Sequence, residues 1–306
     1  MNTEASIKDY LKLHFIVLIW GFTAILGLLI SISSLELVFY RTGIATLILG
    51  LIFWKKGDSL RVPNEELIKI IGTGFIISLH WILFFGAARV STASVCLAGM
   101  ATTSLWTAFL EPLIKGTRVK WFEILLGLMV ISGLYVIFSF ELGYWLGLAM
   151  AIASAFLGAL FSVINSRLTK NHGPYILTFY EMLGACAFAA LTMPIYSYFF
   201  AEEGLQLIPT AMDWVWLLLL SGVCTVYAFS VSVELMRRIT AFAVNLTINL
   251  EPVYGIILAV LIFGEKEQMT GGFYLGTLII LISVLMYPLY NYYQKRMAKR
   301  NNPSGA

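Results

Sequence analysis

Four ionisable side chains stand inside long apolar segments of this 306-residue chain, where they would handle charge or protons. Arg41, His80, Glu181 and Glu251 each lie several residues from the nearest end of such a segment. An ionisable group at the centre of a membrane helix costs about 2.5–3.5 kcal/mol on insertion scales, so each requires a partner or a water-filled cavity. A guanidinium recognises carboxylates, a carboxylate holds amines or protons, and an imidazole relays protons near neutral pH. These residues are therefore the first candidates for a polar site.

Glu251 has the most informative neighbours. It precedes Pro252, which donates no backbone hydrogen bond and kinks a helix, and it lies close in sequence to Asn245 and Asn249. Irregular backbone at membrane depth is tolerated where it lines a cavity or is buried in protein. One interpretation is that this segment faces a substrate path. The other is a structural kink whose glutamate bonds polar groups of a neighbouring helix.

Arg41 and Glu181 stand at mirrored depths in two corresponding apolar segments. They would suit the carboxylate and the amine of a zwitterionic substrate, or else pair with other buried groups or form gate contacts. His80, Glu181 and Glu251 are the candidates for a proton relay, although a lone histidine is more often a packing residue.

The composition is that of a membrane protein. Hydrophobic residues make up 59% of the chain and charged residues 12%, against about 25% charged in soluble domains. Ten apolar segments are close to the roughly 20 residues that cross a bilayer as a helix, and they are too long for barrel strands. The predicted spans are 13–31, 35–54, 68–88, 92–112, 122–140, 144–164, 175–197, 214–236, 240–263 and 271–290. We predict an all-α integral membrane fold with ten transmembrane helices.

The distribution of basic residues predicts the orientation. With the N-terminus in the cytoplasm, the cytoplasmic segments hold 17 of the 20 Lys and Arg residues. Cytoplasmic loops are enriched in Lys and Arg. Both termini are therefore expected in the cytoplasm.

The two halves of the chain are faintly similar in sequence. A shift of 149 residues places Arg89-Val90-Ser91 on Arg238-Ile239-Thr240, and Gly127 on Gly276. Five spans per copy would make the copies inverted, an architecture typical of transporters with a midplane site. The predicted units are a first five-helix repeat over 1–141, a second, inverted repeat over 142–290 and a basic cytoplasmic tail over 291–306.

This shift pairs Glu251-Pro252 with Thr102-Thr103, so the site is expected to be asymmetric on a symmetric scaffold. Deep aromatic residues would add apolar walls for an aromatic or cationic group, although packing is the more common role for any one of them. The predicted substrate-binding residues are Arg41, Trp81, Thr102, Thr103, Tyr180, Glu181, Tyr227, Asn245, Asn249 and Glu251.

Other classes of function lack their signatures. The three cysteines and three histidines show no metal-ligand spacing, no phosphate-binding loop motif is present, and the basic residues form no nucleic-acid patch. We expect no enzymatic activity, no cofactor and no nucleic-acid partner. The expected partners are a small-molecule substrate and the lipid bilayer, with monomer and homodimer both open.

Several short motifs resemble a known family. Trp20-Gly21, Glu111-Pro112-Leu113 and Asn249-Leu250-Glu251-Pro252 before Gly264-Glu265 are similar to segments of the EamA family in the drug/metabolite transporter superfamily. The resemblance implies a secondary carrier, often an exporter of amino acids or other small metabolites, that works by alternating access in the cytoplasmic (inner) membrane. A channel-like facilitator or a non-transporting sensor is the alternative. Substrate, direction and proton coupling stay open.

Overall fold

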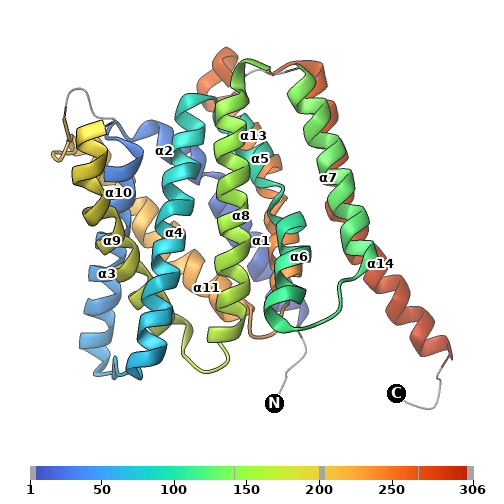
Figure 1. Cartoon of the computed structure of the whole chain (residues 1–306), viewed down its shortest axis with the longest axis horizontal. Helices are drawn as coiled ribbons and strands as arrows, with labels where there is room; N and C mark the ends of the chain where they lie inside the picture. The colour runs from blue at the N-terminus through green and yellow to red at the C-terminus, as the bar shows by residue number, and fades with distance from the viewer. Residues whose placement is uncertain (1–4, 141, 200–203, 268, 302–306) are drawn as a thin grey trace.

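The computed structural model describes residues 5–140, 142–199, 204–267 and 269–301, and every regular element within these ranges is helical. The helices stand side by side, and the start of the first and the end of the last lie at the same end of the molecule (Figure 1). Residue 141 and residues 302–306 of the predicted tail lie outside the described residues, whereas 291–301 continue the last helix.

Eight helical segments are long and apolar enough to cross a membrane. Four are single helices: α3 (Ser34–Lys56), α4 (Asn64–Val90), α8 (Trp145–Leu168) and α9 (Pro174–Phe199). Four are interrupted: α1 (Ile7–Gly21) with α2 (Thr23–Leu29), α5 (Ala93–Met100) with α6 (Thr103–Lys115), α10 (Ala211–Ser221) with α11 (Ala228–Leu235), and α12 (Ala241–Ile248) with α13 (Glu251–Phe263). The predicted spans at 122–140 and 271–290 fall on α7 (Trp121–Phe140) and α14 (Gly271–Asn301), whose apolar stretches are shorter.

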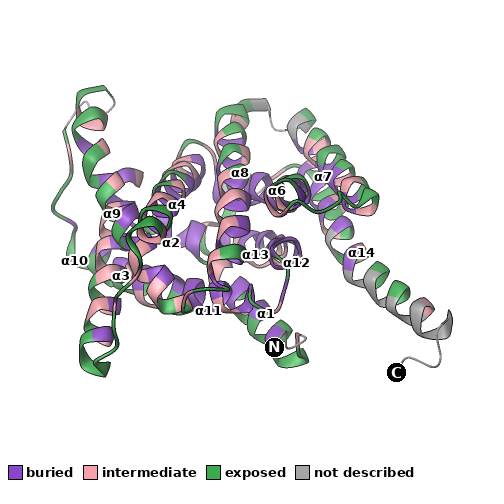
Figure 2. Ribbon diagram, turned by 60° about the horizontal axis from the view of Figure 1, so that its bottom comes forward, coloured by how far each residue is buried: buried purple, intermediate pink, exposed green. Residues whose placement is uncertain are grey.

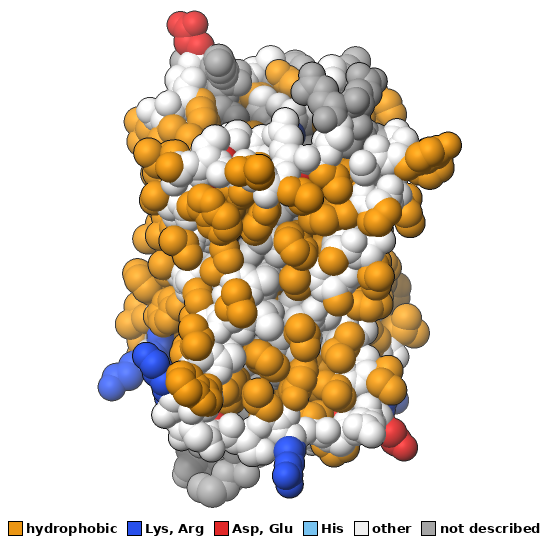
Figure 3. Space-filling view, turned by 90° about the vertical axis from the view of Figure 1, so that its left-hand side faces the viewer, with side chains coloured by type: hydrophobic (Ala, Val, Ile, Leu, Met, Phe, Trp, Pro, Cys, Tyr) orange, Lys and Arg blue, Asp and Glu red, His pale blue; other side chains and the backbone are white. Residues whose placement is uncertain are grey.

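The outer surface is apolar over its middle and charged toward its ends. Figure 3 shows hydrophobic side chains covering one side of the bundle, with Lys and Arg side chains near one end. Large apolar residues far from helix ends are exposed, among them Leu47 at 68%, Leu191 at 69% and Leu128 at 54%. Buried residues concentrate on the faces that the helices turn toward each other (Figure 2). So large an exposed apolar surface is suited to lipid.

The interruptions are local breaks in otherwise continuous spans. The regular α-helical pattern is interrupted at Phe22, at 101–102 and at 249–250, where backbone N–H groups donate to carbonyls three residues earlier. The last interruption comes directly before Glu251-Pro252, as the proline predicts. Threonine hydroxyls bond carbonyls at two breaks, from Thr23 to Trp20 at 2.7 Å and from Thr103 to Met100 at 2.6 Å. Such irregular turns inside helices often mark hinges. The sequence predicted the irregularity at Glu251-Pro252, whereas the breaks at Phe22 and at 101–102 were not predicted.

Two of the broken spans are built alike. α5 and α12 have 8 residues each, α6 and α13 have 13 each, and the starting residues Ala93 and Ala241 stand 148 positions apart. Thr92 and Thr240, also 148 apart, cap both pairs by accepting a backbone N–H through the hydroxyl. The correspondence here is thus one residue away from the predicted shift of 149, and it places Thr103 opposite Glu251.

Candidate functional site

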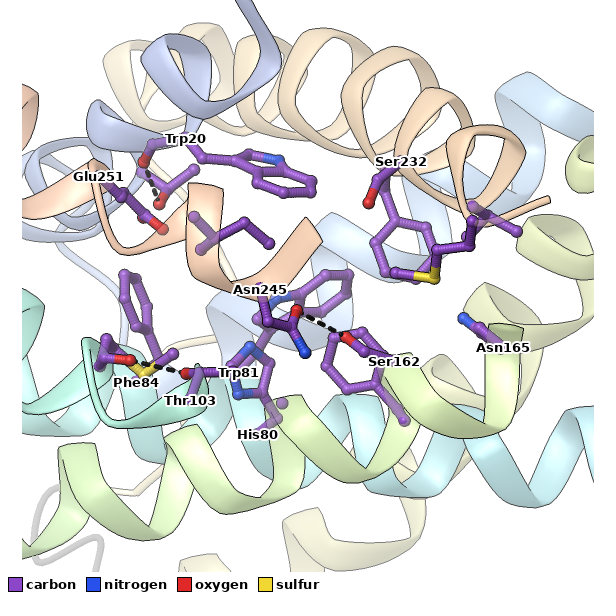
Figure 4. Close-up of a pocket in the computed structure, with 18 of the residues that line it drawn as sticks. Trp20, His80, Trp81, Phe84, Thr103, Ser162, Asn165, Ser232, Asn245 and Glu251 are labelled. Atoms are coloured by element: carbon purple, nitrogen blue, oxygen red, sulfur yellow. Dashed lines mark hydrogen bonds between the residues drawn. The ribbon is translucent and has the colours of Figure 1, made fainter. Parts of the chain in front are cut away.

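A cavity of about 80 Å³ lies where the broken helices meet (Figure 4). Thr23, Thr103 and Glu251 all line it, and each is the first residue of the helix that follows a break. The remaining wall comes from α1, α3, α4, α5, α8, α11 and α12 together with Met236. This volume holds several water molecules.

Arg41 is the cation of the cavity. Its side chain is 3% exposed, and the guanidinium carbon lies 3.7 Å from the ring centre of Trp81. Nε donates to the hydroxyl of Thr225 at 2.8 Å, the one hydrogen bond that joins this guanidinium to a described residue. The planar head group is thus held by the Trp81 ring and by one hydrogen bond to Thr225, and its terminal amino groups remain for another partner.

Thr225 owes its position to a π-helical turn, Gly222–Tyr227, between α10 and α11. Its hydroxyl also donates to the carbonyl of Leu220, five residues earlier, at 2.9 Å. The same turn leaves the carbonyl of Cys224 to accept from the indole of Trp20 at 3.0 Å. Single π-turns of this kind are frequent at functional sites.

Glu251 is the anion of the cavity and is 6% exposed. Within the described residues, no ion pair of 4.0 Å or less joins Glu251 to Arg41. A buried guanidinium and a buried carboxyl group therefore share one cavity without direct contact, which leaves space for a ligand between them.

Amide and hydroxyl groups complete the polar wall. Asn245 donates to Thr107 at 2.8 Å and accepts from Ser162 at 3.2 Å, so it connects three helices. His80 lies with Nδ1 2.8 Å from the carbonyl oxygen of Ser154, a position in which Nδ1 carries the proton, and the Ser154 hydroxyl donates back to the His80 carbonyl. This histidine is fixed by its partners, and its part in proton transfer stays a prediction.

The structure brings six of the predicted site residues together and leaves five outside the lining. Arg41, His80, Trp81, Thr103, Asn245 and Glu251 line the cavity. Those outside the lining are Thr102, Tyr180, Glu181, Tyr227 and Asn249.

The five have different surroundings. The hydroxyl of Thr102 bonds the Gly99 carbonyl, the Tyr180 hydroxyl bonds the Leu60 carbonyl, and Asn249 bonds Ser104. Tyr227 is 43% exposed and packs edge-on against Phe15. Glu181 is fully buried, and neither of its carboxylate oxygens has a hydrogen-bond partner.

Sequence reasoning missed one face of α8. Gly158, Phe161, Ser162 and Asn165 all line the cavity. Their spacing of three, four and seven residues puts them on one face of a helix. Polar residues recurring at this spacing in an apolar span were a signal that would have identified the face.

The fold and the cavity define a class, namely helical multi-pass membrane proteins with a buried polar site between broken helices. The EamA-like transporter family model matches residues 10–139 and 145–288, nearly the whole chain. The chain belongs to this family, as the motifs around Trp20 and Glu251 predicted, and it is therefore a membrane transporter of the drug/metabolite type rather than a member of an enzyme family.

Comparison with solved structures supports the fold. One crystal structure, titled only as that of a protein, superposes with a TM-score of 0.69 over 94% of this chain and 99% of its own, at 17% sequence identity. A likeness at this identity concerns the fold alone. The comparison with curated proteins gives no match.

Proposed function

We propose that this protein is a secondary carrier that moves small zwitterionic metabolites, above all amino acids, through the cavity by alternating access. The observation that carries the proposal is that a buried guanidinium, Arg41, and a buried carboxyl group, Glu251, line one cavity without an ion pair between them. Arg41 would take a carboxylate in the two-pronged geometry that guanidinium groups favour, and Glu251 would take the amine. In this assignment Glu251 replaces Glu181 as the partner of Arg41.

The aromatic wall suits the apolar part of such a substrate. Trp20, Trp81, Phe84, Phe161 and Phe229 all line the cavity. Ligand sites are mostly apolar, with a few polar groups that fix orientation. The cavity is small for a metabolite, so the helices would have to move apart to admit one.

Contacts between the two halves at both ends of the bundle support alternating access. At the end that holds the start of α1, Asp9 pairs with Arg238 at 2.9 Å, and Glu111 accepts from the backbone N–H of Phe242 at 2.8 Å. At the other end, Asp213 accepts from the backbone N–H and the hydroxyl of Ser31 at 2.8 and 2.6 Å. A carrier would break the contacts at one end of the bundle while it keeps those at the other end.

The proposal includes ten spans in two inverted repeats over 1–141 and 142–290, with both termini in the cytoplasm and the protein in the cytoplasmic membrane. It is supported by the 17 basic residues on one side and by the matched pairs α5–α6 and α12–α13. Export is the direction that the resemblance favours.

Counterflow tests the proposal. Purified protein is reconstituted in liposomes loaded with an unlabelled amino-acid mixture, and uptake of the same mixture in labelled form is followed. Acceleration by the internal pool is expected, whereas equal uptake with and without it would indicate a channel. Arg41→Ala and Glu251→Gln should each abolish counterflow while the protein still elutes as a folded species. Normal counterflow by both variants would refute the site.

A further inference from the structure

Glu181 is a buried carboxyl group that the substrate site does not use. It lies on α9, is 0% exposed, and neither of its oxygens has a hydrogen-bond partner. The side chain of Asn165 on α8 is also fully buried, and both its amide atoms likewise lack a partner. Asn165 lies near enough to influence the Glu181 carboxyl group, although no hydrogen bond joins the two side chains, and Asn165 also lines the cavity. Glu181 is therefore one residue removed from the cavity.

Among the described residues, no cation forms an ion pair with this carboxyl group. The helices packed against α9 are α3, α4 and α11. Nearest the middle of α3 and α4 are Arg41 and His80, which have Thr225 and Ser154 as partners. The other charged residues of these three helices are nearer the helix ends, and none of them forms an ion pair with Glu181: Glu36, Lys55, Lys56, Glu65, Glu66, Lys69, Arg89 and Glu234. An unpaired carboxylate in such surroundings is costly, whereas a neutral carboxylic acid is much less so.

The packing of α4 on α9 closes this position from the outside. A Cβ at Gly74 would lie 2.9 Å from the backbone nitrogen of Ala185 and still closer to the carbonyl oxygen of Glu181. A Cβ at Gly184 would lie 2.5 Å from the carbonyl oxygen of Ile71. The backbones of α4 and α9 are therefore in close contact beside Glu181.

We propose that Glu181 is a proton-binding site of the carrier, separate from the substrate site, with Asn165 as the positioning residue between the carboxyl group and the cavity. A hydronium ion in cavity water would give its proton to one carboxylate oxygen of Glu181, which forms an O–H bond and leaves water. The neutral acid would donate to the side-chain oxygen of Asn165. When the cavity faces the other side, the O–H bond would break and the proton would return to water there.

The first test needs no substrate and so stands apart from the proposed function. Infrared difference spectra of the purified protein are recorded from mildly acidic to mildly alkaline pH, in the range of the carboxylic C=O stretch. A titrating band is expected that is lost in Glu181→Gln, shifted in Asn165→Ala and unchanged in Glu65→Gln, an exposed carboxylate at the start of α4. A spectrum of Glu181→Gln identical to that of the unmodified protein would overturn the proposal.

The second test rests on the proposed function and uses the labelled amino-acid mixture in liposomes. Glu181→Gln should retain counterflow at equal pH on both sides and lose accumulation driven by a pH gradient. Retained gradient-driven accumulation would overturn the proton site, and so would a loss of counterflow by a variant that elutes as folded protein. Absence of counterflow in the unmodified protein would instead refute the carrier proposal, and the infrared bands would still decide the proton site.

Discussion

Replacing Arg41 by lysine keeps the positive charge and removes the planar head group, which makes it a sharp test of the site. The guanidinium lies 3.7 Å from the ring centre of Trp81, and Nε donates to Thr225. A lysine ammonium is a compact, strongly hydrated charge that does not offer the two-pronged geometry. A hydrogen bond that involves a charged group is worth about 1.5–3 kcal/mol, and lysine would lose one of the two that the guanidinium gives to the substrate carboxylate. A loss of about 2 kcal/mol, within this range, weakens binding roughly 30-fold, since about 1.4 kcal/mol corresponds to a factor of ten.

The assay is titration calorimetry on detergent-solubilised protein. Its ligand is the amino acid that gives the largest thermal stabilisation among the standard amino acids. Arg41→Lys should raise Kd by the factor above in protein that still elutes as a folded species. Tyr227→Phe is the matched control, because Tyr227 is 43% exposed and outside the lining, and its Kd should not change. An unchanged Kd for Arg41→Lys would refute the assignment of the guanidinium to the substrate.

Two further predictions concern stability. Gly74→Ala should lower the free energy of unfolding by about 1–3 kcal/mol, because the added Cβ would collide with the carbonyl oxygen of Glu181. Gly72→Ala is the control and should not lower it, because nothing lies within 4 Å of a Cβ at that position. Equal melting temperatures for the two variants would contradict the packing described. Glu111→Gln should cost about 0.3–1 kcal/mol, because the carboxylate at the N-terminus of α12 accepts from Phe242 and favours the helix dipole. Melting curves at low and high salt would measure this loss, which should shrink as salt increases.

The sequence predicted the structure where a feature depends on a residue's effect on its own backbone or on its contact with the surrounding solvent. Pro252 removes a backbone donor wherever it stands, so the break before Glu251 was predictable. The threonines at the other breaks gave no comparable signal, since hydroxyl groups are common inside continuous helices. Thr23 and Thr103 became recognisable only by the carbonyls that they bond.

The choice of Glu251 over Glu181 as the partner of Arg41 shows why the rest could not be predicted. Both glutamates stand in apolar spans, and sequence depth alone made Glu181 the better match for Arg41. Which of them reaches the cavity depends on how far each helix is rotated about its axis. Helices that are apolar on all sides show no polar face from which this rotation can be read.

The sequence by itself determined the membrane-spanning helical architecture and the family, because span length, apolar content and short motifs are local properties of the chain. Only the tertiary structure decided which polar groups share a cavity. It placed Thr225 on Arg41 through a π-helical turn, and it brought Asn165 near Glu181 and to the wall of that cavity. These contacts join residues between 16 and 184 positions apart, and they exist only through the packing of helices against one another.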